Sequence, residues 1–309
     1  MRPRNQLSVA TTAAICVAVL AISSSGPLIA FAAAPALAIA FWRNGLAAVL
    51  LAPVTAVRRR EEMRGLFAAG GRRILLSCVL AGVFLAIHFA TWVPSVKLTQ
   101  VADAVALGAT QPVWQGLIAL GQGRKLGRLT WIGIGIAVAG ALATTGADFG
   151  VSSRAVSGDL LAIAGGMAAA VYTAFGERAR SATSTLGYTT VCYSVCATLL
   201  LGICLLFGVK LHGFAPSTWF AILGIVAGAQ LLGHSMFSYA LQHVKATTVS
   251  VVILLEVPGA ALLAWAWLGQ VPSFGSVPGL LLLLVGVIVV VLGARRPITD
   301  SPSTVSDVV

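Results

Sequence analysis

The stretch GVFLAIH at residues 82–88 returns as GAQLLGH at residues 228–234, so Gly82, Leu85 and His88 each meet an identical residue 146 positions later. The same offset, without a gap, aligns Pro112 with Pro258, Gly123 with Gly269, Gly133 with Gly279, and Gly140 with Gly286. Chance readily aligns alanines and leucines in an apolar chain, whereas histidine, proline and several glycines in one register indicate a duplication. The sequence therefore predicts two homologous halves.

The composition predicts a membrane protein. Hydrophobic residues occupy 58% of the 309 positions and charged residues only 9%, whereas a soluble domain is about half apolar and about a quarter charged. This balance excludes a soluble enzyme, a disordered chain and a fibrous protein. The net charge of +11 would suit nucleic acid, but the basic residues stand in short runs between apolar segments. The lipid bilayer is therefore the expected partner, and nucleic acid is not.

Ten apolar runs are long enough to cross a bilayer as helices. They cover residues 8–25, 35–57, 73–93, 99–121, 129–146, 157–176, 185–209, 217–240, 246–268 and 275–293. Breaks between them are predicted at Ser25–Pro27, Arg58–Arg60, Gly70–Arg73, Asp148–Asp159, Pro216 and Pro272. Each run is apolar throughout, whereas the strands of a membrane barrel alternate in polarity. We therefore predict an all-α integral membrane protein with ten transmembrane helices.

Lysine and arginine are unevenly distributed over the loops between these runs. If the N-terminus is cytoplasmic, the inner side carries Arg2, Arg4, Arg58, Arg59, Arg60, Arg64, Arg72, Arg73, Arg124, Lys125, Arg128, Arg178, Arg180, Lys245, Arg295 and Arg296. The outer side carries Lys97, Arg154 and Lys210, and Arg43 lies within a run. Because basic loops favour the cytoplasmic side, both termini are expected inside, in a protein of the cell membrane.

The two halves are expected to be inverted, because five crossings send the second half in from the opposite face. The first repeat is expected at residues 1–146 and the second at residues 157–296, followed by a disordered cytoplasmic tail at residues 297–309. His88 should lie nearer the outer end of its helix, and His234 nearer the inner end of its own. Cleavage of the first run as a signal peptide would break this symmetry, so the run is expected to be retained.

Both halves carry motifs that resemble the drug/metabolite transporter superfamily, specifically its ten-helix EamA-type exporters. HFATWVPSVKLTQVADAVALGATQPVW at residues 88–114 is similar to the family's His-x-x-x-Trp stretch, followed by a threonine and a proline. VILLEVPGAALLAWAWLGQVPS at residues 252–273 is similar to its Glu-Pro, small-residue and Leu-Gly-Glu pattern. AFWRNGLAAVLLA at residues 40–52 is similar to its arginine followed by small residues. The resemblance covers nearly the whole chain.

Two departures from the family pattern concern acidic residues. Pro258 follows Glu256 after one intervening residue, and Gln270 stands where the family has an acid, with Arg124 as its first-half counterpart. A mechanism that relies on an acid at that place is therefore not expected. The resemblance implies export of amino acids, other small metabolites or drugs.

The apolar runs contain five ionisable candidates for function, which are Arg43, His88, Asp103, His234 and Glu256. A charge in hydrocarbon is costly, so each should face a cavity or a partner. Arg43 and Asp103 lie at compatible depths and either clamp two helices or form an outer gate, unless Arg43 binds a substrate carboxylate. Glu256, near the midplane, is a substrate or proton site or a protonated structural group. The two histidines either hydrogen bond structurally or line the site.

Aromatic and amide side chains inside the runs are expected to shape a substrate cavity. They are Trp92, Gln111, Trp114, Gln115, Tyr172, Gln230, Tyr239 and Trp265. Tryptophan and tyrosine near span ends alternatively anchor helices at the membrane interface, and buried amides need partners. The five cysteines lie within apolar runs and show no zinc-binding spacing, so neither a metal nor a cofactor is expected.

These features favour a secondary transporter over an enzyme. It would export small metabolites, such as amino acids or related amphipathic solutes, by alternating access, with protons as the candidate coupling ion. No phosphate-binding Gly-x-x-x-x-Gly-Lys-Ser/Thr motif is present, so ATP is not the direct energy source. The alternatives are a carrier for a nucleotide-sugar or lipid-linked substrate, an intramembrane enzyme and a membrane scaffold. The oligomeric state stays open, with a homodimer among the options.

Overall fold

The computed structural model describes residues 9–123, 127–148, 152–244, 246–271, 274–275 and 277–295. Within these residues the regular elements are all helical. Several predictions lie outside the described residues, namely those on Arg2, Arg4, Arg124, Lys125, Lys245, Pro272 and Arg296 and on the tail at 297–309.

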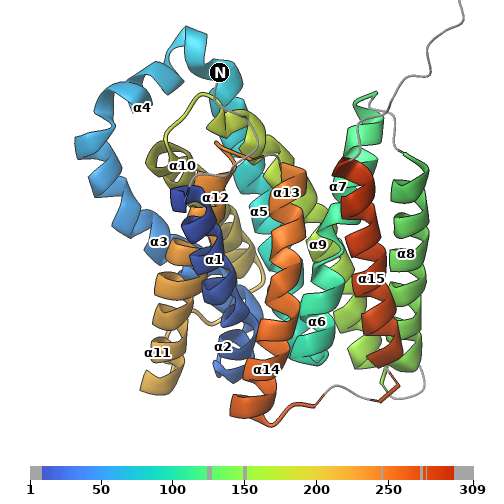
Figure 1. Cartoon of the computed structure of the whole chain (residues 1–309). Helices are drawn as coiled ribbons and strands as arrows, with labels where there is room; N and C mark the ends of the chain where they lie inside the picture. Colours follow the sequence, from blue (N-terminus) through green and yellow to red (C-terminus); the bar gives the residue numbers. More distant parts are fainter. Residues whose placement is uncertain are drawn as a thin grey trace, which may run out of the picture.

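In its described residues, the first half contains nine helical segments, and Figure 1 shows how they are arranged. They are α1 (Val9–Ser23), α2 (Ser25–Phe31), α3 (Ala36–Arg58), α4 (Arg60–Phe67), the 3₁₀ turn η1 (Ala69–Gly71), α5 (Arg72–Leu98), α6 (Val101–Gly108), α7 (Gln111–Gly121) and α8 (Arg128–Asp148).

The second half follows the same plan. Its segments are α9 (Ser153–Arg180), α10 (Thr185–Leu206), α11 (Pro216–Ile225), the π-helix η2 (Val226–His234), α12 (Ser235–Ala240), α13 (Ala246–Val252), the 3₁₀ turn η3 (Ile253–Leu255), α14 (Glu256–Leu268) and α15 (Val277–Arg295).

Six stretches of helix are long and apolar enough to cross a membrane. They are Val9–Phe31, Ala36–Arg58, Ala69–Leu98, Ser153–Arg180, Thr185–Leu206 and Pro216–Ala240. The other four predicted runs are occupied by α6 with α7, by α8, by α13 with α14, and by α15. The chain is therefore a multi-pass helical membrane protein, in which six of the ten predicted spans stand as long apolar helices.

Two predicted breaks are wrong in position. Ser25–Pro27 lies inside α2, because proline is tolerated in the first turn of a helix, where its missing N–H has no partner to lose. The chain leaves the membrane helix only after Phe31. The predicted loop at Asp148–Asp159 is shorter, because the Ser152 hydroxyl accepts hydrogen bonds from two backbone N–H groups and starts α9 at Ser153.

The two halves meet along paired glycines. α8 lies beside α15 (Figure 1), and a side chain on Gly140 would stand 2.3 Å from the backbone nitrogen of Leu283. Its duplicate Gly286 has the same role, since a Cβ there would stand 2.2 Å from the backbone nitrogen of Ala137. Small residues let helices approach this closely in a membrane. The duplicated pair Gly140 and Gly286 is thus a symmetric contact between the halves.

Two helices are interrupted at duplicated positions. Pro112 stands in the first turn of α7 and Pro258 in the first turn of α14. A proline removes one backbone donor and its ring crowds the carbonyl four residues earlier, which favours an irregular turn, although α3 and α5 continue through Pro53 and Pro94. The first run divides into α6 and α7, and the second stays helical but tightens to the 3₁₀ turn η3 between α13 and α14. Both new helices begin in the interior of the bundle, next to the cavity described below.

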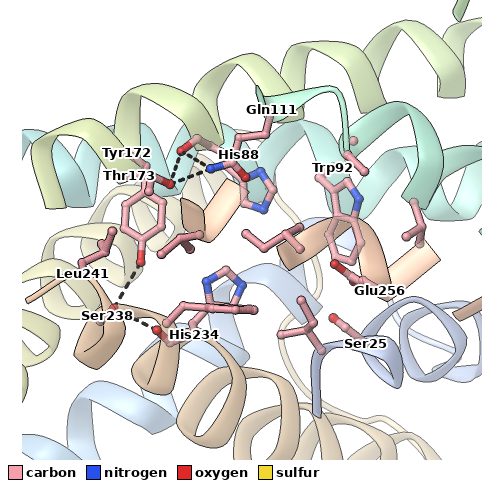
Figure 2. Close-up of a pocket in the computed structure, with 18 residues that line it drawn as sticks. Ser25, His88, Trp92, Gln111, Tyr172, Thr173, His234, Ser238, Leu241 and Glu256 are labelled. Carbon is pink, nitrogen blue, oxygen red and sulfur yellow. Dashed lines mark hydrogen bonds between the residues drawn. The ribbon is translucent and has the colours of Figure 1, made fainter. Parts of the chain in front are cut away.

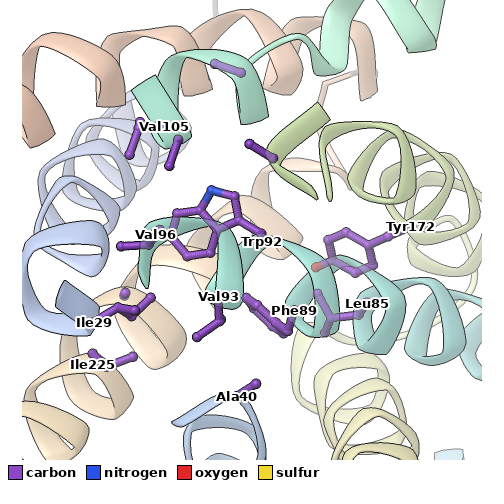
Figure 3. Close-up of a cluster of buried hydrophobic side chains, with 14 of the residues drawn as sticks. Ile29, Ala40, Leu85, Phe89, Trp92, Val93, Val96, Val105, Tyr172 and Ile225 are labelled. Carbon is purple, nitrogen blue, oxygen red and sulfur yellow. The ribbon is translucent and has the colours of Figure 1, made fainter. Parts of the chain in front are cut away.

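The hydrophobic core joins both halves around α5. Figure 3 shows Trp92, Phe89 and Leu85 on this helix, with Tyr172 of α9 and Ile225 of α11 around them. All five belong to one cluster of buried side chains. Because α5 packs against α9 over much of its length, the core fixes the two halves against each other on one side of the cavity.

Candidate functional site

A cavity of about 70 Å³ lies between the two halves. Its lining comes from α1, α2, α5, α6 and α7 of the first half, and from α9, η2, α12, α13, η3 and α14 of the second. Figure 2 shows Trp92, Glu256 and Ser25 around one end of the cavity and Tyr172 and Ser238 around the other. Every lining residue belongs to a helix or to the end of a helix. A movement of one half relative to the other therefore changes the shape of the cavity directly.

The interrupted helices meet at this cavity. Gly108 ends α6, Gln111 begins α7 and Glu256 begins α14, and all three line the space. Glu256 stands directly after η3, and its backbone N–H is already hydrogen bonded to carbonyl groups of that turn. Discontinuous helices at matching places in two repeats are typical of the binding site in inverted-repeat transporters.

The duplicated histidines come together at the cavity. The rings of His88 and His234 have centroids 6.4 Å apart, although the two residues belong to opposite halves. Nδ1 of His88 lies 2.9 Å from the carbonyl oxygen of Gly165; because a carbonyl only accepts, Nδ1 carries the proton and Nε2 is the acceptor nitrogen of the neutral ring. The two rings therefore cannot differ in depth by more than this separation of 6.4 Å.

Aromatic rings stack around this histidine pair. The His88 ring lies parallel to that of Trp92, with centroids 5.8 Å apart. His234 lies edge-on to Phe89 at 5.3 Å and 6.3 Å from the Tyr172 ring. The rings hold both imidazoles in fixed orientations, and the cavity gains a polarisable surface for an amphipathic solute.

Hydroxyl groups line the other end of the cavity. Nε2 of Gln111 donates to the Thr173 hydroxyl at 2.8 Å, which ties the start of α7 to α9. The hydroxyls of Tyr172 and Ser238 are 3.5 Å apart, and Ser238 donates to the carbonyl of His234 at 2.8 Å. The cavity therefore offers hydrogen-bonding groups from both halves.

Arg43 lies behind the cavity, fully buried. Its Nε donates to Oε1 of Gln230 at 2.9 Å and its Nη1 to the Ser25 hydroxyl at 3.3 Å. Its guanidinium carbon stands 4.0 Å above the Phe89 ring, a cation–π contact. Gln230 in turn donates to the side-chain oxygen of Asn44 at 3.0 Å. Ser25 lines the cavity, so this network reaches the site through one hydroxyl.

The possible pair of Arg43 with Asp103 stays a prediction. Arg43 contacts Gln230 and Ser25, and Asp103 is buried within α6 at 1% exposure. Helical rise predicts the depth of each residue but leaves the direction of its side chain around the helix axis undetermined.

The remaining predicted residues divide by their distance from the cavity. Glu256, His88, His234, Trp92, Gln111 and Tyr172 line it. Gln230 supports Arg43 behind it. Gln115 donates to the carbonyl of Ala170 at 2.7 Å, and Trp114 donates to the Thr110 hydroxyl at 3.1 Å. The Tyr239 ring lies tilted against His243 with centroids 4.9 Å apart, and Trp265 is 59% exposed. These four residues therefore act outside the cavity as helix contacts or as an exposed ring.

Several lining residues escaped the sequence prediction. Ser25, Thr173 and Ser238 are ordinary hydroxyl residues, and such side chains in helices often bond only to their own backbone. Arg180 was expected in a cytoplasmic loop, yet it is buried, and its guanidinium donates to the Ser238 carbonyl at 2.8 Å and to Gln242 at 2.8 Å. The hydroxyl residues and Arg180 carry no distinctive signal of this site in the sequence.

One end of the bundle is closed by contacts near the C-termini of α2, α5 and α14. Nζ of Lys97 donates to the backbone carbonyls of Ala30 and Ala32. The side-chain oxygen of Gln270 accepts from the Val101 N–H at 3.1 Å, which joins the two halves. Two more contacts between the halves at this end are Ala33 N–H to the Thr218 hydroxyl at 3.2 Å and the stacked rings of Phe31 and Trp267 at 5.0 Å.

Comparison with known proteins agrees with this architecture. The profile of the EamA-like transporter family matches residues 8–146 and 156–292, one match in each half. The chain belongs to the EamA-like transporter family. The family is part of the drug/metabolite transporter superfamily, so the resemblance of the motifs is confirmed. The EamA-like chain is thus a membrane transporter, and its two matches fit a two-repeat architecture.

A solved structure, titled only as the crystal structure of a protein, resembles the EamA-like chain in fold. The TM-score is 0.65 at 19% sequence identity, and the alignment covers 93% of this chain and 99% of the other. At this identity the likeness concerns the fold alone. No curated protein sequence matches the chain.

Proposed function

We propose that this protein is a secondary transporter that exports small amphipathic metabolites, such as amino acids, by alternating access at the cavity between its halves. The observation that carries the proposal is the pair of interrupted helices, α6–α7 and α13–α14, whose breaks face one cavity that also holds Glu256. Inverted-repeat carriers place their substrate and coupling ions at such breaks.

The lining supports a solute with both apolar and polar parts. Trp92 and Phe237 offer apolar surface, while Glu256, Ser25 and Thr173 offer polar groups. A carboxylate suits an ammonium group or a proton. Among the described residues the lining contains no lysine or arginine, which disfavours a nucleotide-sugar carrier, since a diphosphate needs several cations.

The cavity size supports a mechanism in which the halves move. A space of about 70 Å³ holds only a few water molecules, whereas ligand pockets usually measure about 300–1,000 Å³. A metabolite therefore enters only when the lining helices separate. Two similar packings of duplicated halves provide the two states that alternating access requires.

The distribution of basic residues supports the direction of opening. We place the closed end, near Lys97, on the outer side and both chain termini in the cytoplasm of a cell-membrane protein, because basic loops favour the inside. The structure then has its outer end sealed by contacts between the halves. Export requires these contacts to break after the solute has bound from inside.

Proton coupling is proposed to run through Glu256. The test uses purified protein in proteoliposomes, with amino-acid flux driven by an imposed proton gradient. Glu256→Gln should abolish flux driven by the gradient, while exchange of labelled for unlabelled solute continues. Glu61→Gln is the matched control, because Glu61 is an exposed acid on α4. Unchanged gradient-driven flux in Glu256→Gln would refute the coupling role.

A further inference from the structure

A second, separate groove lies between the end of α3 and α4, with Thr190 of α10 at its floor. Its volume is about 700 Å³, and its walls carry Arg60 and Arg64 together with Ala52, Ala56, Met63 and Phe67. In Figure 1, α4 stands at the edge of the molecule, away from the cavity between the halves. The groove is thus independent of the proposed transport site.

The face of α4 that lines the groove carries two arginines and two apolar residues. Arg60, Met63, Arg64 and Phe67 follow the spacing of one helical face, and all four line the groove. The acid Glu62 lies on the other side, where its carboxylate accepts the Ser184 N–H at 2.7 Å. The Glu62 carboxylate therefore contacts the residue before α10, whereas the face of α4 that lines the groove carries Arg60 and Arg64.

The walls of the groove continue into an apolar, membrane-spanning helix. Ala52 and Ala56 are one turn apart on α3, which is apolar and long enough to cross the bilayer. Phe67 is 64% exposed at the rim. Below them, the hydroxyls of Thr55 and Thr190 are hydrogen bonded at 2.6 Å and close the floor. The groove therefore has a cationic part, formed by Arg60 and Arg64, and an apolar part, formed by Ala52 and Ala56.

We propose that this groove binds one anionic phospholipid of the inner leaflet, with its phosphate between Arg60 and Arg64 and an acyl chain along Ala52 and Ala56. Guanidinium groups bind phosphate through charge-assisted hydrogen bonds, and clustered basic residues beside a span are attracted to anionic lipids. The apolar walls select a lipid over a soluble phosphate, because burying them needs a hydrocarbon partner. The lipid would fix α4 at the membrane surface.

The test is lipid binding to the detergent-purified full chain, measured by native mass spectrometry. Phosphatidylglycerol and phosphatidylcholine with identical acyl chains are titrated separately. The wild type should bind one phosphatidylglycerol more tightly than phosphatidylcholine. The double variant Arg60→Gln/Arg64→Gln should bind phosphatidylglycerol about thirty-fold more weakly, the factor expected for two arginines near a membrane surface.

The matched control is Arg72→Gln/Arg73→Gln, which removes the same charge from the exposed start of α5. It should weaken phosphatidylglycerol binding by less than threefold. Equal weakening in both double variants would show general attraction to the basic surface and overturn the proposal. Equal affinity for the two lipids, or displacement of the lipid by millimolar glycerol phosphate, would overturn it as well. Circular dichroism checks folding, and Phe67→Ser, which should weaken both lipids, replaces the double variant if that does not fold.

Discussion

The contact between α8 and α15 predicts opposite effects for one substitution at two places on the same helix. Gly140→Ala adds a methyl group that would stand 2.3 Å from the backbone nitrogen of Leu283, so the helices must separate by about 1 Å to restore van der Waals contact. Overpacking of this kind costs about 1–3 kcal/mol. Gly135→Ala meets no atom within 4 Å and should gain about 0.5–1 kcal/mol from helix propensity.

The assay is SDS-induced unfolding of the purified protein, followed by circular dichroism. Gly140→Ala should lose stability, Gly135→Ala should gain it, and Gly286→Ala should resemble Gly140→Ala because duplication gives the two glycines equivalent contacts. The double variant Gly140→Ala/Gly286→Ala should cost less than the sum, since one separation of the helices relieves both clashes. If Gly140→Ala is as stable as Gly135→Ala, the close packing of the halves is refuted.

Two further predictions concern the groups around the cavity. Arg43→Lys should lower stability by about 2 kcal/mol in the same assay, because lysine lacks the planar fork whose separate nitrogens reach Gln230 and Ser25; the exposed Arg178→Lys is the control and should change nothing. Lys97→Met should raise the rate at which a membrane-impermeant maleimide, added from outside, labels a cysteine placed in the cavity, since the bonds that hold the outer end of α2 are lost. An unchanged rate would show that Lys97 does not help to close that end.

A two-repeat organisation was predictable because it depends on rare residues in register, and one family match in each half fits it. Hydropathy predicted ten spans, of which six stand as long apolar helices in the part of the chain that the structure describes. The interruptions were not predicted, although Pro112 and Pro258 were both recognised as duplicated positions. A hydropathy profile does not detect such interruptions, because an apolar run gives the same profile whether its backbone is continuous or broken. The π-helix at Val226–His234 likewise has no distinctive composition.

The site was partly predictable for a related reason. Few ionisable residues lie in the apolar runs, and because placing a charge in hydrocarbon costs free energy, each of them is a candidate for function. Glu256, His88 and His234 do line the cavity. The hydrogen-bond partners of these residues were harder to predict, because the sequence indicates how deep a residue lies along its helix but not which neighbouring helix its side chain faces. The contact of Arg43 with Gln230, for example, was not predicted.

The measurement that tests the central claim most directly is the accessibility of the cavity from each side of the membrane. Ala109, which lines the cavity at the break between α6 and α7, is replaced by cysteine in a chain whose five native cysteines are serine. We predict labelling from either side by a membrane-impermeant maleimide, and protection from both sides when transported solute is added. Labelling from one side only, or labelling that solute never reduces, would contradict alternating access at this cavity.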